Sequence, residues 1–243
     1  MEVRTLSEAG VQPLDIKTIL NKQSDEPVHA NLNTIYNEIN AHRIEKLAGQ
    51  SSIEYLIGQL KSLDFIYTID QNDENQIQSL FFTLPQSIHL LKQFHSVILM
   101  DCTYKTNKFN MPLLHICGFT NTNHSFSVGF CFVTKENIPS YTWALLQLKN
   151  LLKGLVPEVI ISDWDLALSK ALKKTFPSSS HLLCIWHINK NVVAKCKKHF
   201  TSGDSWNAFY SKWQSLVESE TESVSLIFEY IFHQPKRINI SII

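Results

Sequence analysis

The spacing of apolar residues predicts helices over the first quarter of the chain. Apolar side chains recur every three or four positions after Pro13, over Leu32–Leu47 and over Ser52–Leu63. This is the period of a helix with one buried face. We therefore expect three helices, the third capped by Ser51 or by Ser52 itself. The segment SDEPVHAN, residues 24–31, reads as an exposed linker between the first two.

After residue 64 the pattern becomes typical of strands. Apolar residues at 65–69 and 80–82 flank the polar stretch DQNDENQ, which predicts a hairpin. A short helix at 86–93 leads into the apolar run Val97–Met100, which stops at Asp101. Such a run suits a strand that is buried on both faces.

The remaining pattern alternates between strands and helices. Its order, β-β-β-α-β-α-β-α, predicts an α/β fold whose first strands are antiparallel. Residues from Ser202 onward look helical at first and then lose any regular period. The expected strands are 112–119, 125–133, 159–161 and 181–184, and the expected helices are 139–152, 166–176 and 186–199.

The composition excludes several classes of protein. Hydrophobic residues make up 44% of the 243 positions and charged residues 18%, which is typical of a soluble globular chain. No apolar stretch approaches the roughly 20 residues that span a bilayer, and the start MEVRTLSEAG lacks a signal-peptide pattern. The five cysteines are scattered and odd in number, so we expect no disulfide framework. These features indicate an intracellular protein.

The charges are balanced overall but unevenly placed. With 22 basic and 22 acidic residues the net charge is +0, which alone argues against a general nucleic-acid binder. Between Asp165 and Asp204, however, there is no acidic residue. A basic patch there favours phosphate contact, although solubility alone would also account for it. The candidate DNA-binding residues are Lys170, Lys173, Lys174, Lys190, Lys197 and Lys198.

Two aspartates are the first candidates for chemistry. Asp101 and Asp163 each follow an apolar strand, with two strands and a helix between them. If the two strands lie side by side, both carboxylates emerge at one edge of the sheet and can hold divalent ions for phosphodiester chemistry. The alternative is that each aspartate only caps the following turn or helix.

Three sequence blocks around these aspartates resemble a known family. D-C-T-Y-K-T-N-K-F-N-M-P-L spans 101–113, S-D-W-D-L-A-L spans 162–168, and L-C-I-W-H-I-N-K-N-V spans 183–192. They resemble, in the same order, the D-x-T-Y-x-T-N-x-x-x-M-P-L, T/S-D-x-x-x-A-L and L-C-x-W-H-I-x-K-N-V blocks of Mutator-like element (MULE) transposases. The resemblance covers residues 94 to about 200.

The resemblance implies a ribonuclease-H-like mixed sheet with flanking helices, preceded here by a small helical region. It also implies a catalytic triad of two aspartates and a glutamate that holds two Mg²⁺ or Mn²⁺ ions. By motif position Asp101 is the first acid and Asp163 the second, and Asp165 is a candidate capping or supporting acid. The family's third acid lies downstream in a segment that has no match here. The remaining candidates, none in that context, are Glu218, Glu220, Glu222 and Glu229.

Cys184 and His187 allow two interpretations. Their C-x-x-H spacing, repeated by Cys196 and His199, matches a zinc site. Cys196 also falls on an apolar helical stripe, which favours a place in the core. In the family this block lies near the catalytic acids, so we expect His187 to contact a phosphate or shuttle a proton, and Cys184 to be packed.

We therefore divide the chain into a helical N-terminal region, a transposase core and a tail, at residues 1–63, 64–200 and 201–243. The expected function is that of a DNA transposase-derived domain, inactive because the third acid is missing. The alternative is a non-catalytic DNA-binding regulator, since plant far-red-response transcription factors carry a similar domain. A C-terminally truncated core would leave Trp206, Phe209 and Trp213 poorly buried. We expect DNA as the partner and the nucleus as the location, leave homo-oligomerisation open, and expect neither a membrane nor a small-molecule substrate.

Overall fold

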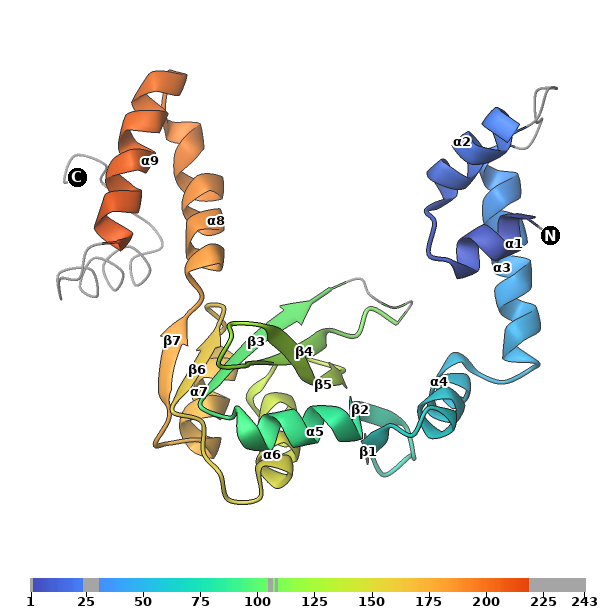
Figure 1. Cartoon of the computed structure of the whole chain (residues 1–243), viewed down its shortest axis with the longest axis horizontal. Helices are drawn as coiled ribbons and strands as arrows, with labels where there is room; N and C mark the ends of the chain where they lie inside the picture. The colour runs from blue at the N-terminus through green and yellow to red at the C-terminus, as the bar shows by residue number, and fades with distance from the viewer. Residues whose placement is uncertain (1, 24–30, 105–106, 108, 219–243) are drawn as a thin grey trace.

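The computed structural model describes residues 2–23, 31–104, 107 and 109–218 (Figure 1). The expected linker at 24–30 and the glutamates at 220, 222 and 229 lie outside these residues. The helices are α1 (Glu2–Glu8), α2 (Pro13–Gln23), α3 (Leu32–Leu47), α4 (Ser52–Ser62), α5 (Pro85–Gln93), α6 (Ile138–Leu152), α7 (Leu166–Thr175), α8 (Ile185–Cys196) and α9 (Gly203–Val217), with a 3₁₀ turn at Lys197–His199. The strands are β1 (Ile66–Gln71), β2 (Ile77–Thr83), β3 (Val97–Thr103), β4 (Leu113–Phe119), β5 (Ser125–Val133), β6 (Val159–Ser162) and β7 (Ser180–Leu183).

All of these strands form one mixed sheet in the order β1-β2-β5-β4-β3-β6-β7. The pairs β1·β2, β2·β5, β5·β4 and β4·β3 are antiparallel, whereas β3·β6 and β6·β7 are parallel. An antiparallel meander of three strands followed by two parallel strands, with helices between them, is the ribonuclease-H-like arrangement that the sequence predicts. The hairpin β1–β2 extends the sheet beyond β5.

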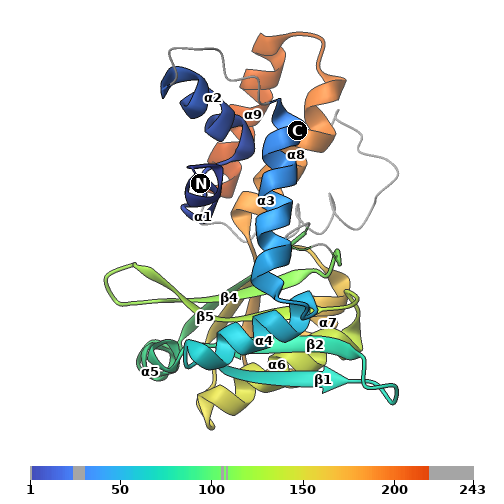
Figure 2. The same cartoon turned by 90° about the vertical axis from the view of Figure 1, so that its right-hand side faces the viewer.

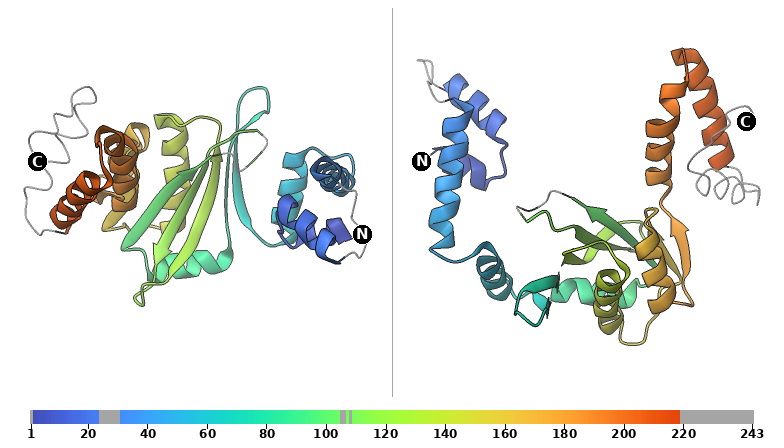
Figure 3. Two further views of the ribbon diagram at one scale, coloured as in Figure 1. Left: turned by 90° about the horizontal axis from the view of Figure 1, so that it is seen from above. Right: turned by 180° about the vertical axis from the view of Figure 1, so that it is seen from behind.

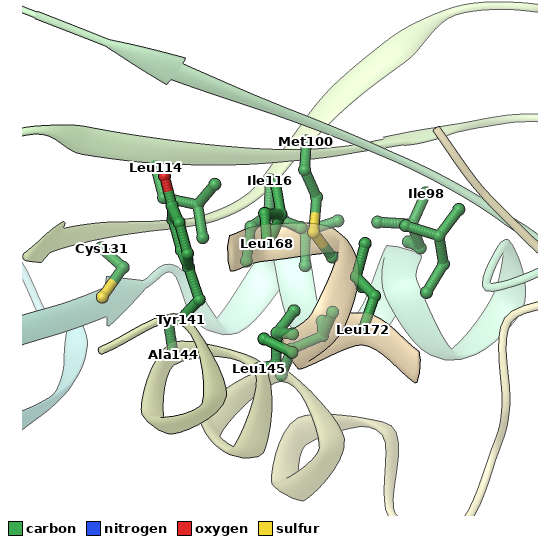
Figure 4. Close-up of a cluster of buried hydrophobic side chains, with 14 of the residues drawn as sticks. Ile98, Met100, Leu114, Ile116, Cys131, Tyr141, Ala144, Leu145, Leu168 and Leu172 are labelled. Atoms are coloured by element: carbon green, nitrogen blue, oxygen red, sulfur yellow. The ribbon is translucent and has the colours of Figure 1, made fainter. Parts of the chain in front are cut away.

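The main core lies between one face of this sheet and the helices α5, α6 and α7. Inward-facing residues of β3 and β4 meet those of α6 and α7, as Figure 4 shows. Tyr141, Leu145 and Leu148 of α6 are completely buried, and Leu168 and Leu172 of α7 are 0% and 2% exposed. The helix period of these apolar residues explains why each helix presents one face to the sheet.

Two groups of helices lie outside this core. Helices α1, α2 and α3 contact one another at the β1 side of the molecule, and α8 with α9 projects beyond the β7 side (Figures 1 and 3). Seen from the side, both groups rise above the same edge of the sheet (Figure 2). In the described part of the chain no helix combines the length and apolarity needed to cross a membrane.

Side-chain caps explain where the N-terminal helices begin. Asn31 caps α3 by accepting a hydrogen bond from the backbone N–H of Thr34 at 2.8 Å. Ser51 caps α4 in a capping box with Glu54, as the sequence predicts. Helix α1, which the sequence pattern did not predict, is held to α3 by Arg4, whose guanidinium contacts Glu38 at 2.6 Å and Glu45 at 2.7 Å.

Strand β3 differs from the expectation in two ways. It continues past Asp101 to Thr103, because its pairing with β4 extends to Leu113 while its pairing with β6 stops at Met100. It is also not buried on both faces. Ile98, Met100 and Cys102 face the helices and are buried, whereas Val97, Leu99 and Asp101 on the other face are half-buried.

The expectation that the C-terminal aromatic residues are poorly buried is wrong for the tryptophans. Trp206 is 8% exposed and Trp213 is 2% exposed, because α8 and α9 enclose a second, smaller core with Ile188, Val192 and Cys196. Trp213 also donates a hydrogen bond from Nε1 to Oδ1 of Asn189 at 2.7 Å. The aromatic residues of α9 therefore have a partner in α8.

Candidate active site

The candidate site lies at the edge of the sheet where four strands end. Strands β3 and β5 run in the same direction because each is antiparallel to β4, and β6 and β7 are parallel to β3. The segments that follow these four strands therefore leave the sheet at one edge. The end of β3 and the segments that follow the four strands carry Asp101 to Tyr104, Glu136, Asp163 to Asp165, and Cys184 to His187.

The register places the two predicted acids next to each other. Met100 pairs with Ser162, so Asp101 and Asp163 occupy equivalent positions on adjacent parallel strands. Nε2 of His187 lies 3.3 Å from Oδ1 of Asp101. His187 sits in the first turn of α8, so the carboxylate of Asp101 also lies near a helix N-terminus, where negative charge is stabilised.

The carboxyl of Asp163 lies in an environment that disfavours its ionised form. Burial raises its pKa; the charge of His187 opposes this shift, and those of Asp165, Asp101 and Glu136 add to it. Its Oδ1 is buried and has no hydrogen-bond partner within the described part of the chain. An ionised oxygen in this position gains stability from any cation or donor that reaches it.

Asp165 has the capping role that was one of its two predicted roles. It is the N-cap of α7, and its Oδ1 accepts a hydrogen bond from the backbone N–H of Leu168 at 2.6 Å. Asp163, two residues earlier, does not cap α7. The two aspartates of the S-D-W-D block therefore have different roles. Asp165 fixes the start of the helix, whereas the carboxylate of Asp163 lies at the sheet edge.

Glu136, which the sequence pattern did not single out, lies at the same edge. Its Oε1 accepts hydrogen bonds from the hydroxyl of Tyr104 at 2.6 Å and from that of Tyr141 at 2.9 Å. Tyr141 is 0% exposed, and burial together with the nearby charge of Glu136 keeps its pKa above the usual range, so the phenol stays protonated as a donor. Two donors thus hold the Glu136 carboxylate beside the site.

The Cys-His pairs do not assemble as zinc ligands. Cys196 is 7% exposed and packs in the core between α8 and α9, as the apolar stripe predicts. Cys184 is the N-cap residue of α8 and is half-buried, while His187 turns toward Asp101. Cys196, from the second Cys-x-x-His pair, is therefore a core residue.

The six candidate lysines are exposed, but they occupy three different elements. Lys170, Lys173 and Lys174 lie on the outer face of α7, opposite the buried Leu168 and Leu172. Lys190 lies on α8, and Lys197 and Lys198 lie on the 3₁₀ turn that follows it. Figure 1 shows α7 against the sheet and α8 projecting away from it.

The residues at this edge fit a loosely held hard cation better than a closed metal cage. Among the described residues, no group of three or more His, Cys, Asp or Glu side chains is arranged to hold a metal ion. Asp101 and Asp163 nevertheless offer carboxylate oxygens, one of them buried and without a partner. Mg²⁺ commonly binds proteins through one or two carboxylates and keeps several waters, so these two residues satisfy its minimal needs.

The similarity to solved structures is too low to support the fold assignment. The chain is similar to the protein in the crystal structure of the Mos1 strand transfer complex, with 9% sequence identity, 87% coverage of each chain and a TM-score of 0.26. A score this low carries no argument about the site. The ribonuclease-H-like assignment rests on the strand order and directions described above.

Comparison with protein sequences is more informative. Protein FAR1-RELATED SEQUENCE 5 of Arabidopsis thaliana is 23% identical over 227 residues, which cover 89% of this chain and 28% of that protein. Protein FAR1-RELATED SEQUENCE 11 of the same plant is 27% identical over 183 residues, which cover 72% of this chain and 26% of that protein. The chain thus spans about a quarter of the length of these relatives. The family model of the MULE transposase domain matches residues 97–191, so this stretch, which holds Asp101, Asp163 and His187, is similar to that domain.

Proposed function

We propose that this chain is a transposase-derived DNA-binding domain that holds a divalent cation at Asp101 and Asp163 and does not itself cut DNA. The observation that carries the proposal is the convergence of the three sequence blocks at one sheet edge. Each block contributes there: Asp101 from β3, Asp163 after β6, and His187 from α8. A domain with this ancestry acts on chromosomal DNA, so we place it in the nucleus.

Each residue at the edge has a proposed part in binding. Asp101 and Asp163 would hold Mg²⁺ or Mn²⁺, which supplies charge stabilisation at phosphodiester oxygens when it is bound. His187 lies 3.3 Å from Asp101 and competes with the cation for this carboxylate, and Asp165 fixes the start of α7. The exposed lysines of α7, of α8 and of the turn after α8 would contact DNA phosphates.

The proposal that the chain does not cut DNA rests on the number of carboxylates available to bind metal ions. Strand cleavage by two metal ions needs carboxylates that converge on both ions. Glu136 supplies a third carboxylate at this edge, but its Oε1 is already engaged by Tyr104 and Tyr141. The rival function is metal-dependent strand cleavage, and it would require another acid to join Asp101 and Asp163.

The test of DNA binding is its dependence on salt. Binding to a duplex of arbitrary sequence should weaken steeply as salt rises, because a protein that neutralises phosphates releases counterions. Replacing Lys170, Lys173 and Lys174 together with glutamine should lower the affinity and flatten the salt slope. The slope should change by up to about three units, roughly one for each phosphate that the variant no longer neutralises.

A matched control carries the same charge change on other elements. The triple variant of Lys22, Lys61 and Lys92 to glutamine alters exposed lysines of α2, α4 and α5. It should leave the salt slope close to that of the unaltered chain. If the chain binds no duplex at low salt, or if both triple variants lower the slope equally, the α7 lysines are only a solvated surface and the proposal fails.

A further inference from the structure

An exposed apolar patch lies beside the acids at the same sheet edge. Large apolar side chains here are unusually open to solvent, and two of them are tryptophans. Large exposed apolar side chains at the ends of neighbouring strands are candidates for an interaction site. The patch consists of Trp164, Leu166, Leu182, Ile185 and Trp186, with 37%, 61%, 51%, 42% and 59% exposure.

The sheet register brings the two tryptophans to neighbouring strand ends. Ser162 of β6 pairs with Leu183 of β7, and the backbone N–H of Cys184 donates to the carbonyl of Ser162 at 2.7 Å. Trp164 follows two residues after Ser162, and Trp186 follows three residues after Leu183. Each also adjoins a site residue in sequence: Trp164 follows Asp163, and Trp186 precedes His187.

The surroundings of Trp186 suit a ligand that has both a ring and a phosphate. Nζ of Lys190 lies 4.8 Å from the centroid of the Trp186 ring, and the His187 ring meets it edge-on with centroids 4.7 Å apart. The indole is therefore held on two sides while 59% of its surface stays exposed. A flat group stacked on it would place its attached phosphate within reach of the lysine.

Charge favours a nucleic acid over a protein as the occupant. Residues 166–203, which run through α7 and α8, contain seven lysines and no acid. Phosphates are attracted to this surface but repelled by Asp101 and Asp163 where no cation is bound. A nucleobase is uncharged, so it can lie against the tryptophans beside the carboxylates without that repulsion.

We propose that Trp164 and Trp186 form a stacking platform for an unpaired base of the bound DNA, directly beside the Asp101–Asp163 edge. A base within an intact duplex cannot reach the platform, because both of its faces are already stacked. The platform therefore selects DNA that contains a single-stranded or flipped-out nucleotide. This inference rests on the proposed DNA-binding function and names the form of DNA that the site takes.

The test compares three labelled DNAs by fluorescence anisotropy: a single strand, a fully paired duplex, and the same duplex with one unpaired thymine. The intact chain should bind the single strand and the bulged duplex more tightly than the paired duplex. Trp186→Ala should weaken binding to the first two by about tenfold, the scale of one base stacked on one ring, and binding to the paired duplex by less than about twofold. Trp164→Ala should act in the same direction.

Two further variants control for shape and folding. Trp186→Phe keeps an aromatic face and should retain most of the preference for unpaired DNA. Ile44→Ala removes an equally exposed but aliphatic side chain of α3, outside the patch, and should leave all three affinities unchanged. Circular dichroism and thermal unfolding of each variant establish that the fold is intact.

The outcomes separate this inference from the proposed function. If the chain binds none of the three DNAs, the proposed function itself fails. If it binds DNA but Trp186→Ala weakens all three equally, or if Ile44→Ala acts like Trp186→Ala, the platform is not a base-stacking site. If the tryptophan variants change only the self-association seen by light scattering, the patch docks a second copy and the inference is overturned.

Discussion

Nε2 of His187 lies 3.3 Å from Oδ1 of Asp101, which joins the first turn of α8 to the end of β3. The same oxygen is one of the few that a divalent cation could use at this edge. His187 and a bound cation therefore compete for Asp101. The consequence can be measured directly as a change in cation affinity.

His187→Ala is expected to strengthen Mn²⁺ binding by up to about fivefold, the scale of a partly exposed polar contact that no longer has to be broken. Free Mn²⁺ in a titration can be followed by electron paramagnetic resonance. A weaker affinity in this variant would mean that His187 is itself a ligand, and the competition described above would be wrong.

Asp163→Asn is expected to weaken Mn²⁺ binding by about tenfold or more, because it removes a ligand charge. Glu136→Gln should weaken it less, because its Oε1 is held by two tyrosines and its charge acts from a distance. Glu158→Gln is the matched control, since Glu158 precedes β6 at the opposite edge and accepts a hydrogen bond from Ser96. Equal effects of the two glutamate variants would remove Glu136 from the site.

Asp163→Asn should also stabilise the chain in metal-free buffer. The pKa of Asp163 is raised by burial, so the ionised carboxyl costs folding stability once the pH exceeds its folded-state pKa. The cost is absent below its unfolded pKa of about 3.9. Asparagine carries no charge, so Asp163→Asn should raise the unfolding free energy at neutral pH.

Thermal unfolding in EDTA measures this gain at several pH values. The gain in stability should shrink as the pH falls toward the pKa of a free carboxyl group, because the protonated aspartate no longer carries the cost. A variant that is less stable than the unaltered chain at neutral pH would show that Asp163 has a stabilising partner in the folded protein.

Tyr141→Phe should cost about 1.5–3 kcal/mol of unfolding free energy, the usual range for a hydrogen bond to a charged group. Tyr104→Phe removes a hydroxyl bound to the same Oε1 atom, yet Tyr104 is 59% exposed and Tyr141 is 0% exposed. Water replaces the exposed donor but not the buried one, so Tyr104→Phe should cost well under half as much. Urea unfolding of both variants checks the ratio, and equal costs would contradict the role given to burial.

Much of the fold could be predicted because local patterns and tertiary structure agree. The bounds of α3 coincide with Leu32–Leu47 because Asn31 caps its start and Ala48, in the left-handed conformation, ends it. Asp101 and Asp163 lie at the same edge because the two apolar strands that lead to them are parallel neighbours. Helix α1 was not predicted, because seven residues without a buried side chain leave no apolar period.

The predictions from the sequence differ from the structure where a residue's position depends on contacts between segments that are distant along the chain. The burial of Trp206 and Trp213 depends on the packing of α9 against α8. The sequence pattern of neither helix alone indicates this packing. Glu136 was missed because the third acid was sought only downstream, where the family has it. A three-strand meander returns its third strand to the direction of the first, so the residues after β5 reach the edge of Asp101. That geometric signal was present in the predicted strand order.

The measurement that tests the account most directly is the fate of supercoiled plasmid incubated with the purified chain and Mn²⁺. Before protease treatment the plasmid should migrate more slowly, in a salt-sensitive way, because the chain is bound to it. After protease treatment it should return to the supercoiled position. Nicked plasmid that appears with the unaltered chain and disappears with Asp101→Ala would contradict the account and show that another acid completes the site.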